Sequence, residues 1–275
     1  MNTRSATGTA RRAARSDTMK YAARTGFTAR GIIYLLVGLL ALQIALSGGG
    51  KSADRGGALA EIAEKPFGKF LLWAMGIALV GMALWRLSEA LFGAAGVDGH
   101  KPKKRLLSAA RAVFYGFVSY SVLAFAAGGR SSGGGSSDQQ SQDVTAKVME
   151  LPAGQWLVGA GGLVIAGAGV WIGVRAVMRK YHKHLKMGEM PHRVRQLVDV
   201  TGVGGGVARG LVFAVAGGFA VAAAVSYDPE KAKGMDDTIR SFRETPVGPW
   251  LLVVLAVGLM LFGVFSFAMA RWRKL

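Results

Sequence analysis

The chain has 275 residues, of which 51% are hydrophobic, a mean hydropathy of +0.33 and a formal net charge of +18. The hydrophobic residues gather in long runs, which is typical of a membrane protein and unusual for a soluble domain. The chain contains no cysteine, which excludes disulfides, a thiol nucleophile and cysteine metal ligands.

The N-terminal segment 1–25 is basic and rich in small residues, and we expect it to be a disordered tail. Six apolar runs follow it, each near the length of about 20 residues that a helix needs to cross the ~30 Å hydrocarbon core. They cover 29–47, 68–92, 106–127, 154–178, 205–226 and 248–270. No run alternates like a barrel strand, so we expect six transmembrane helices.

A motif with the spacing Glu-x-Pro-x-Gly precedes every second apolar run. Its three copies are Glu64, Pro66 and Gly68; Glu150, Pro152 and Gly154; and Glu244, Pro246 and Gly248. An arginine opens the preceding run in each case, and an aromatic residue stands 19 positions after each proline. These residues are Arg30, Arg111 and Arg209, and Trp85, Trp171 and Phe265. Three ordered matches indicate an internal repeat of two helices.

The repeat divides the chain into three units with the same orientation. We place repeat one at 26–92, repeat two at 106–178 and repeat three at 205–270. Basic loops connect them at 93–105 and 179–204, and a basic C-terminal tail covers 271–275. Three parallel units predict an all-α bundle of six transmembrane helices with a pseudo-threefold axis along the membrane normal. A cleaved signal peptide is disfavoured, because cleavage would remove the first helix of repeat one.

The repeat resembles the bacterial membrane family called domain of unknown function 1206. In that family Ala-Arg-Gly with a following Tyr opens the first helix of a two-helix unit, and Pro-Phe-Gly opens the second. Repeat one matches with Ala29-Arg30-Gly31 and Pro66-Phe67-Gly68. The other repeats depart from the pattern at Ala112, Phe213, Ala153 and Val247. The resemblance implies the tandem two-helix architecture and no assigned activity.

Basic residues are concentrated on one side of the predicted membrane. The N-terminal tail, the second and fourth connections with Arg175, and the C-terminal tail hold 20 basic and four acidic residues, against 10 basic and 11 acidic residues in the other three connections with Lys69. The positive-inside rule therefore predicts a bacterial inner-membrane protein with both termini in the cytoplasm. We expect the basic face to contact anionic lipid headgroups, and no nucleic acid.

Each outer connection ends in a stretch that favours a short helix lying at the membrane interface, at 54–64, 143–151 and 236–244. We expect Asp54, Asp143 and Asp236 to be the N-caps. The proline of the motif then fits the first turn of the next long helix, and the glutamate accepts N–H groups there. An alternative is that Glu64, Glu150 and Glu244 form an outer ring that attracts cations.

Two interpretations are open for Arg30, Arg111 and Arg209. Each extends to the lipid headgroups and anchors its helix, or the three form a ring around the repeat axis that binds a phosphate or a lipid headgroup. Arg86 and Glu89, three residues apart on one helix, are expected to form a local ion pair. The spacing Gly169-x-x-x-Gly173 favours close helix packing, within the chain or between copies of it.

Residues with recognisable catalytic chemistry are not apparent in the sequence. The four histidines lie in the basic connections, where positive charge opposes a metal ion, and Gly202 to Gly206 lacks the Gly-Lys-Ser/Thr ending of a phosphate loop. We therefore expect no enzyme, no cofactor and no metal. The leading interpretation is a non-enzymatic structural component that binds lipid or a membrane-protein partner. The alternative is a passive channel or a transporter of small solutes or anions along the repeat axis.

Overall fold

The computed structural model describes residues 17–47, 52–93, 102–128, 137–243 and 248–274. Six long helices dominate these ranges, and each is long and apolar enough to cross a membrane. They are α2 (Asp17–Ser47), α4 (Gly68–Phe92), α5 (Pro102–Ala126), α7 (Gly154–Val177), α8 (His192–Ser226) and α10 (Gly248–Trp272). The all-α class and the six predicted spans are confirmed.

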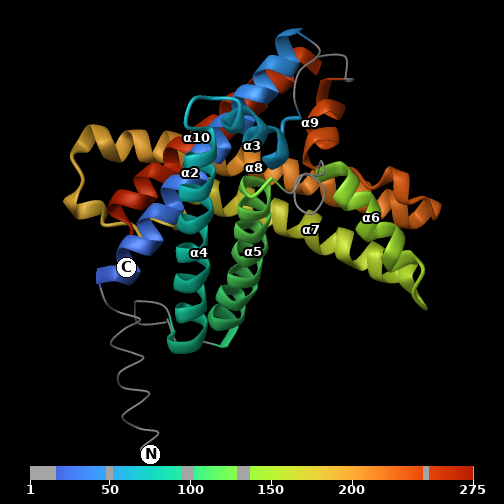
Figure 1. Cartoon of the computed structure of the whole chain (residues 1–275), viewed down its shortest axis with the longest axis horizontal. Helices are drawn as coiled ribbons and strands as arrows, with labels where there is room; N and C mark the ends of the chain where they lie inside the picture. Colours follow the sequence, from blue (N-terminus) through green and yellow to red (C-terminus); the bar gives the residue numbers. More distant parts are fainter. Residues whose placement is uncertain (1–16, 48–51, 94–101, 129–136, 244–247, 275) are drawn as a thin grey trace, which may run out of the picture.

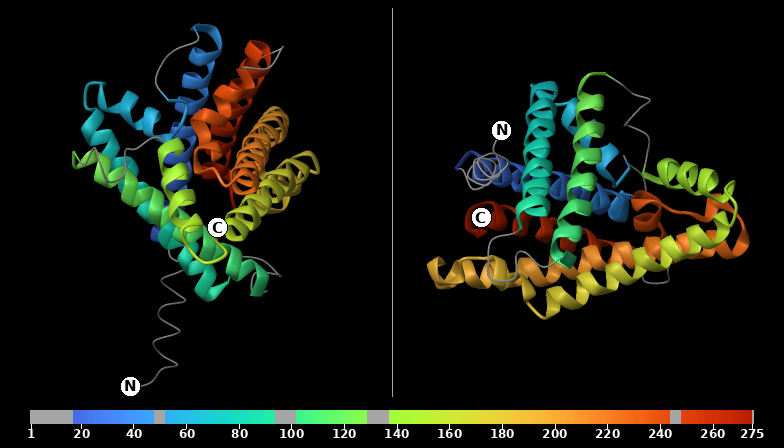
Figure 2. Two further views of the ribbon diagram at one scale, coloured as in Figure 1. Left: turned by 90° about the vertical axis from the view of Figure 1, so that its right-hand side faces the viewer. Right: turned by 90° about the horizontal axis from the view of Figure 1, so that it is seen from below.

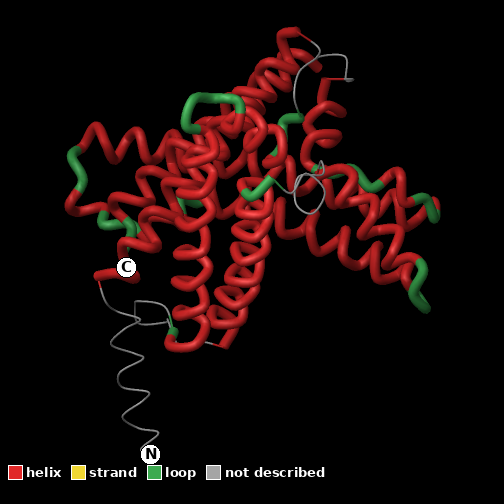
Figure 3. Tube along the Cα trace, in the orientation of Figure 1, coloured by secondary structure: helices red, strands yellow, loops and turns green. Residues whose placement is uncertain are grey.

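Short helices separate the two long helices of each repeat, as the sequence predicts. They are α3 (Arg55–Ala63), α6 (Ser137–Met149) and α9 (Met235–Arg243), and short 3₁₀ segments are η1 (Lys180–His184), η2 (Met187–Glu189) and η3 (Pro229–Lys231). Because each repeat runs down and back, α3, α6 and α9 share one end of the molecule, which we call the short-helix end (Figures 1 and 3). The opposite end, where α2 begins and α10 ends, we call the arginine end.

Two long helices begin earlier than the sequence predicts. Residues 17–25, expected in the disordered tail, form the first turns of α2, and residues 192–204, expected in a loop, belong to α8. Tertiary packing explains the extension, because Ala23 and Val198 are buried in these added turns. The rest of the predicted tail, 1–16, lies outside the described residues.

Of the three predicted N-caps, only Asp54 caps its helix. Asp54 caps α3 and accepts a hydrogen bond from Gly57 N at 2.8 Å. Asp143 does not cap α6, because that helix begins six residues earlier, at Ser137. Asp236 lies within the first turn of α9 and accepts from Ala53 N at 2.6 Å, so it ties α9 to the start of α3.

In repeats one and two, the Glu-x-Pro-x-Gly motif forms a tight turn between a short and a long helix. The proline precedes the first helical turn, where we expected it to lie within that turn, and Phe67 or Ala153 follows it with a φ of 61°. Gly68 and Gly154 then begin the long helices. A Cβ on Gly68 would lie 2.0 Å from Ile62 O, so only glycine permits this approach of the two helices.

The long helices pack mainly between successive repeats. The second helix of one repeat pairs with the first helix of the next, so the extensive pairs are α4 with α5, α7 with α8, and α10 with α2. The α10–α2 pair closes the cycle from repeat three back to repeat one. This cyclic order is what a pseudo-threefold arrangement requires. Figure 2 shows the three pairs leaning away from one another.

Equivalent small residues make these interfaces close. A Cβ on Gly169 of α7 would lie 2.3 Å from Ala214 N of α8, and one on Gly263 of α10 would lie 2.9 Å from Gly31 O of α2. Gly169 and Gly263 both stand 17 positions after their repeat's proline. The predicted spacing Gly169-x-x-x-Gly173 packs within the chain, as the first of our two interpretations proposed, because a Cβ on Gly210 of α8 would also lie 2.8 Å from Gly173 N.

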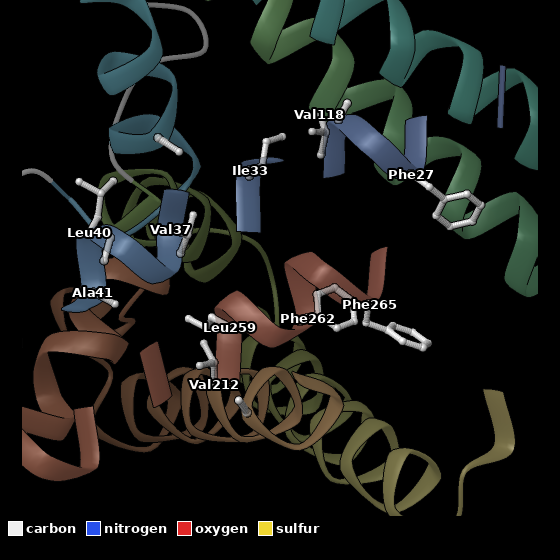
Figure 4. Close-up of a cluster of buried hydrophobic side chains, with 14 of the residues drawn as sticks. Phe27, Ile33, Val37, Leu40, Ala41, Val118, Val212, Leu259, Phe262 and Phe265 are labelled. Carbon is white, nitrogen blue, oxygen red and sulfur yellow. The ribbon is translucent and has the colours of Figure 1, made fainter. Parts of the chain in front are cut away.

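A hydrophobic core fills the space between the helix pairs (Figure 4). Side chains from four helices meet there: Phe27, Ile33, Val37, Leu40 and Ala41 of α2; Val118 of α5; Val212 of α8; and Leu259, Phe262 and Phe265 of α10. The space between these four helices is therefore occupied by packed apolar side chains.

Candidate functional site

The three arginines that open the first helices lie near the arginine end and are half-buried. Arg30 donates from Nε to Ser266 Oγ at 3.1 Å and from Nη1 to Tyr115 Oη at 3.3 Å. Arg30 and Arg209 stack on the same ring, that of Phe262, at 5.1 and 4.9 Å from its centroid. Arg111 interacts electrostatically with Arg209, so the structure brings all three arginines into one electrostatic environment.

Two further arginines join this group. Arg86 of α4 is only 5% exposed and stacks on Trp85 at 4.2 Å, and Arg273 lies over the same ring at 4.8 Å. Arg273 also stacks on the ring of Phe27, and Arg30 lies over the same ring at 4.8 Å from its centroid. We call Arg30, Arg86, Arg111, Arg209 and Arg273 the arginine cluster.

Positive charge in the cluster exceeds the negative charge that the described residues supply. Glu89 accepts from Arg86 Nη1 at 2.7 Å, which is the predicted ion pair, and from Ser108 Oγ at 3.3 Å. Among the described residues, Glu89 is the carboxylate that attracts the charges of Arg111 and Arg273 most strongly. Five guanidinium groups thus face one buried carboxylate, and such an excess is costly where water is removed.

Several hydrogen-bond donors of the cluster have no partner among the described residues. The Nε atoms of Arg86, Arg209 and Arg273 are all buried and unpaired. Aromatic rings cover the faces of these guanidinium groups, whereas the N–H donors point along their edges. A ligand that carries acceptor oxygens would satisfy these edges.

The loop between α7 and α8, which contains η1 and η2, covers the arginine end beside the cluster. Lys186 N donates to Trp272 O and Lys274 N to His184 O, both at 2.9 Å, which fastens the loop to the end of α10. His184 keeps part of its surface exposed. Loss of solvent around its ring, and then the charges of Arg273 and Arg175, lower its pKa to about 4.

The other histidine of the loop joins a separate polar group. His182 Nε2 lies 2.5 Å from Asp199 Oδ1, and Tyr181 Oη donates to the same oxygen at 3.0 Å. Loss of solvent and the bond to Asp199 raise the pKa of Tyr181 above its usual range. Asp199 links the loop to the first turns of α8, which gives these residues a structural role.

The glutamates of the motif are not brought together. Glu64 and Glu150 are exposed on different repeats, and Glu244 and Pro246 lie outside the described residues. The acids that do meet at the short-helix end are aspartates. Carboxylate oxygens of Asp138, Asp236 and Asp237 lie within 4.8 Å of one another, and Asp138 Oδ1 accepts from Asp237 N at 3.0 Å.

Sequence reasoning missed Arg86 and Arg273 as partners of the three predicted arginines. It treated Arg86 as a local pair and Arg273 as part of a solvated tail. The position 20 residues after each proline carried a signal, because it holds Arg86, Ile172 and Ser266 in the three repeats. Two of these three residues are polar inside apolar runs, and both reach the cluster.

Comparison with known sequences places the chain in a family. Residues 25–93, 107–179 and 204–273 each match the family described as Domain of Unknown Function (DUF1206). The chain belongs to the DUF1206 family. A relative from Bacillus subtilis (strain 168), the uncharacterized protein YxxB, is 32% identical over 249 residues, which is 88% of this chain and 87% of the relative. No solved structure matches this DUF1206 chain.

With its six apolar helices, the DUF1206 protein is a multi-pass membrane protein built from three tandem repeats. Its arginine cluster is assembled from α2, α4, α5 and α8 together with the residue that follows α10. All three repeats therefore contribute to this site, and the cyclic packing of the repeats is what brings the side chains together.

Proposed function

We propose that this protein is a non-enzymatic membrane component that binds a phosphate-bearing anion in the arginine cluster. The observation that carries the proposal is the excess of guanidinium charge over carboxylate charge in the cluster, together with the Nε atoms of Arg86, Arg209 and Arg273, which are buried and have no hydrogen-bond partner among the described residues. A phosphate group offers several acceptor oxygens and negative charge, and guanidinium edges match its geometry.

The chemistry of the cluster supports binding and no bond-making step. Guanidinium groups keep their protons near neutral pH, so they hold charge without acting as a base or a nucleophile. Aromatic rings fix their positions from the other side. Free phosphate esters and anionic lipid headgroups share the chemistry that such a site recognises.

Permeation along the repeat axis is a weaker proposal. Apolar side chains such as Ile33, Val37 and Leu259 are buried in the core between the helix pairs (Figure 4). A passive channel or carrier along the repeat axis needs a water-accessible path. The packed core favours binding over permeation.

We further propose that the arginine end faces the cytoplasm of a bacterial inner membrane, where anionic headgroups supply the phosphate. The basic residues of this end then serve the lipid surface or a membrane-protein partner, and no nucleic acid. In a chain without cysteine, a cysteine replacing Arg271 should react with a membrane-impermeant maleimide only in inverted vesicles, and one replacing Gln142 only in right-side-out vesicles. The reverse pattern would contradict this orientation.

Ligand-dependent stabilisation tests the binding proposal. Glycerol phosphate and phosphatidylglycerol should raise the melting midpoint of the detergent-solubilised protein, whereas glycerol and phosphatidylcholine should not, because a ligand bound only by the folded state stabilises it. Arg111→Gln and Arg209→Gln should remove the rise. Lys103→Gln removes the same charge from an exposed position on α5 and should keep it. Equal responses of Arg111→Gln and Lys103→Gln would overturn the proposal.

The two phosphate sources separate in the same experiment. A rise with phosphatidylglycerol alone identifies a lipid headgroup as the ligand, and a rise with glycerol phosphate alone identifies a soluble phosphate ester. The absence of any phosphate-dependent rise contradicts the proposed function.

A further inference from the structure

Repeat two departs from the packing of the other repeats. In repeats one and three the two long helices contact each other, as α2 with α4 and α8 with α10. The corresponding helices of repeat two, α5 and α7, do not form such an interface. Figure 2 shows α4 and α5 leaning to one side of α2 and α10, and α7 and α8 to the other.

One face of α7 is exposed where its counterparts form the core. The aromatic residue 19 positions after the proline is 5% exposed at Trp85 and 7% at Phe265, but 56% at Trp171. Three further positions show the same contrast. Gly161, Ile165 and Ala168 are exposed, whereas Met75, Leu79 and Met82 of α4 and Leu255, Leu259 and Phe262 of α10 are buried.

One side of α5 is also uncovered. Phe114 is exposed, whereas its counterparts Ile33 and Val212 are buried in the core. Phe117, one turn further along the helix, is exposed as well, but Arg55 of α3 lies over its ring at 5.7 Å from the centroid. We call Phe114 of α5, with Gly161, Ile165, Ala168 and Trp171 of α7, the repeat-two face.

The repeat-two face is apolar along the membrane and positive at its end. Gly161 to Trp171 spans ten residues, or about 15 Å of helix, which is about half of a ~30 Å hydrocarbon core. Arg175 follows Trp171 by one turn, and Arg111 precedes Phe114 by one turn on α5. The charges of both arginines act on His184 of the loop at the arginine end.

We propose that the repeat-two face holds an acyl chain of an anionic phospholipid whose phosphate occupies the arginine cluster. This inference rests on the proposed function and specifies the ligand as a membrane lipid that enters sideways between α5 and α7. The apolar length matches one leaflet, and the charge at its end matches a headgroup. Gly161 leaves room for the chain, because a Cβ there would have no atom within 4 Å.

Fluorescence quenching at matched positions tests where the chain lies. In the cysteine-free protein, Ile165→Cys places a bimane label on the repeat-two face. Leu163→Cys on the same helix is the control, because position 163 and its counterparts Ile77 and Val257 are exposed in all three repeats and face bulk lipid. The labelled proteins are placed in phosphatidylcholine nanodiscs with a small fraction of phosphatidylglycerol carrying brominated chains.

Quenching at position 165 should be saturable and several-fold stronger than at position 163, and Arg111→Gln should reduce it to the control level. Brominated phosphatidylcholine at the same fraction should quench both positions alike. Equal quenching by brominated phosphatidylglycerol at both positions would overturn the inference. A disulfide between two copies through position 165 would also overturn it, because a second chain would then cover this face.

Gly161→Leu provides a second test that does not depend on labels. It fills the repeat-two face without a clash, so the protein should fold and keep its stabilisation by glycerol phosphate. Its stabilisation by phosphatidylglycerol should fall several-fold. If both stabilisations persist, the chain lies elsewhere and only this inference fails. If glycerol phosphate and phosphatidylglycerol both lack an effect on the unmodified protein, the proposed function fails.

Discussion

At the scale of single residues, the site depends on aromatic rings that hold arginines in an apolar surrounding. Trp85 lies under Arg86 and Arg273, and Phe262 lies under Arg30 and Arg209. A ring attracts the face of a guanidinium group but offers no acceptor to its edge N–H donors. The cluster is therefore held in position and still lacks part of its hydrogen bonding.

His184 should report the arrival of an anion. Its pKa is about 4 because of lost solvent and of positive neighbours, which include Arg273, Arg175 and Arg111. A bound phosphate offsets these charges and favours the protonated ring, so the pKa should rise towards the ordinary value of about 6.5. The ring then takes up a proton on binding, and affinity should increase as pH falls from about 6.5 towards 4.

Histidine-selective NMR across a pH titration, with and without glycerol phosphate, measures this change. The same titration of Arg111→Gln should show no ligand-dependent rise. A His184 titration that glycerol phosphate leaves unmoved in the unmodified protein would count against an anion in the cluster.

Individual residues also show where prediction from sequence stops. The repeat marks Arg30, Arg111 and Arg209 because they share a position in three copies. Arg86 and Arg273 share no such position with them and reach the cluster through the packing of α4 and α10. Pairwise contacts between helices distant in sequence do not follow from the repeat pattern, so these partners require the fold.

At the scale of elements, glycine decides how closely two helices approach. α7 is glycine-rich on several faces, but only some of these glycines lie against α8. Gly169 faces the backbone of Ala214, whereas a Cβ added to Gly167 would have no atom within 4 Å. The spacing of small residues in the sequence predicted close packing, and the structure shows which face makes it.

We expect Gly169→Ala to destabilise the protein by about 1–3 kcal/mol, because the added methyl group overpacks the α7–α8 interface. Gly167→Ala should be neutral or slightly stabilising, since alanine favours a helix over glycine by up to about 1 kcal/mol. Denaturant unfolding in one detergent measures both. Equal losses at the two positions would show that α7 and α8 do not pack through Gly169.

The aspartates at the short-helix end should make the stability of that end depend on pH. Burial, and then repulsion by Asp237, Asp236 and Asp54, raise the pKa of Asp138 from 3.8 to about 6. A raised pKa favours the folded state below the unfolded value, and this contribution is lost as pH rises through about 6. Contacts among α3, α6 and α9 should therefore loosen as pH rises from about 4 through about 6.

Asp138→Asn should remove this dependence while its side-chain oxygen still accepts from Asp237 N. The variant should exceed the unmodified protein in stability at pH 7.5 by on the order of 1–2 kcal/mol, since one pKa unit corresponds to about 1.4 kcal/mol. Near pH 4 the difference should vanish. Amide hydrogen exchange of α6 at the two pH values measures it, and a variant that is less protected at pH 7.5 would contradict the assignment.

At the scale of the whole molecule, three copies of one unit produce a cyclic arrangement that is incomplete. The sequence was sufficient to predict the three repeats, the six spans and the packing role of the glycines, because each leaves a periodic signal. It was not sufficient to predict that α5 and α7 remain apart. Gly161 and Trp171 occupy the same repeat positions as core residues, and only their exposure in the structure shows the difference.

Repeat two, which departs from symmetry, also contributes Arg111 to the arginine cluster. The uncovered helices of repeat two carry Arg111 and Arg175, which place charge where the apolar face ends. If α5 and α7 packed against each other as the helices of the other repeats do, these arginines would be buried without access from the membrane. The incomplete cycle thus connects the charged site to the bilayer.

A high-resolution structure in nanodiscs that contain phosphatidylglycerol tests the central claim most directly. We predict density for a phosphate group within hydrogen-bonding distance of the Nε atoms of Arg86 and Arg209. A cluster that contains only water, with Arg30, Arg111 and Arg209 turned outward to the headgroups of bulk lipid, would contradict it.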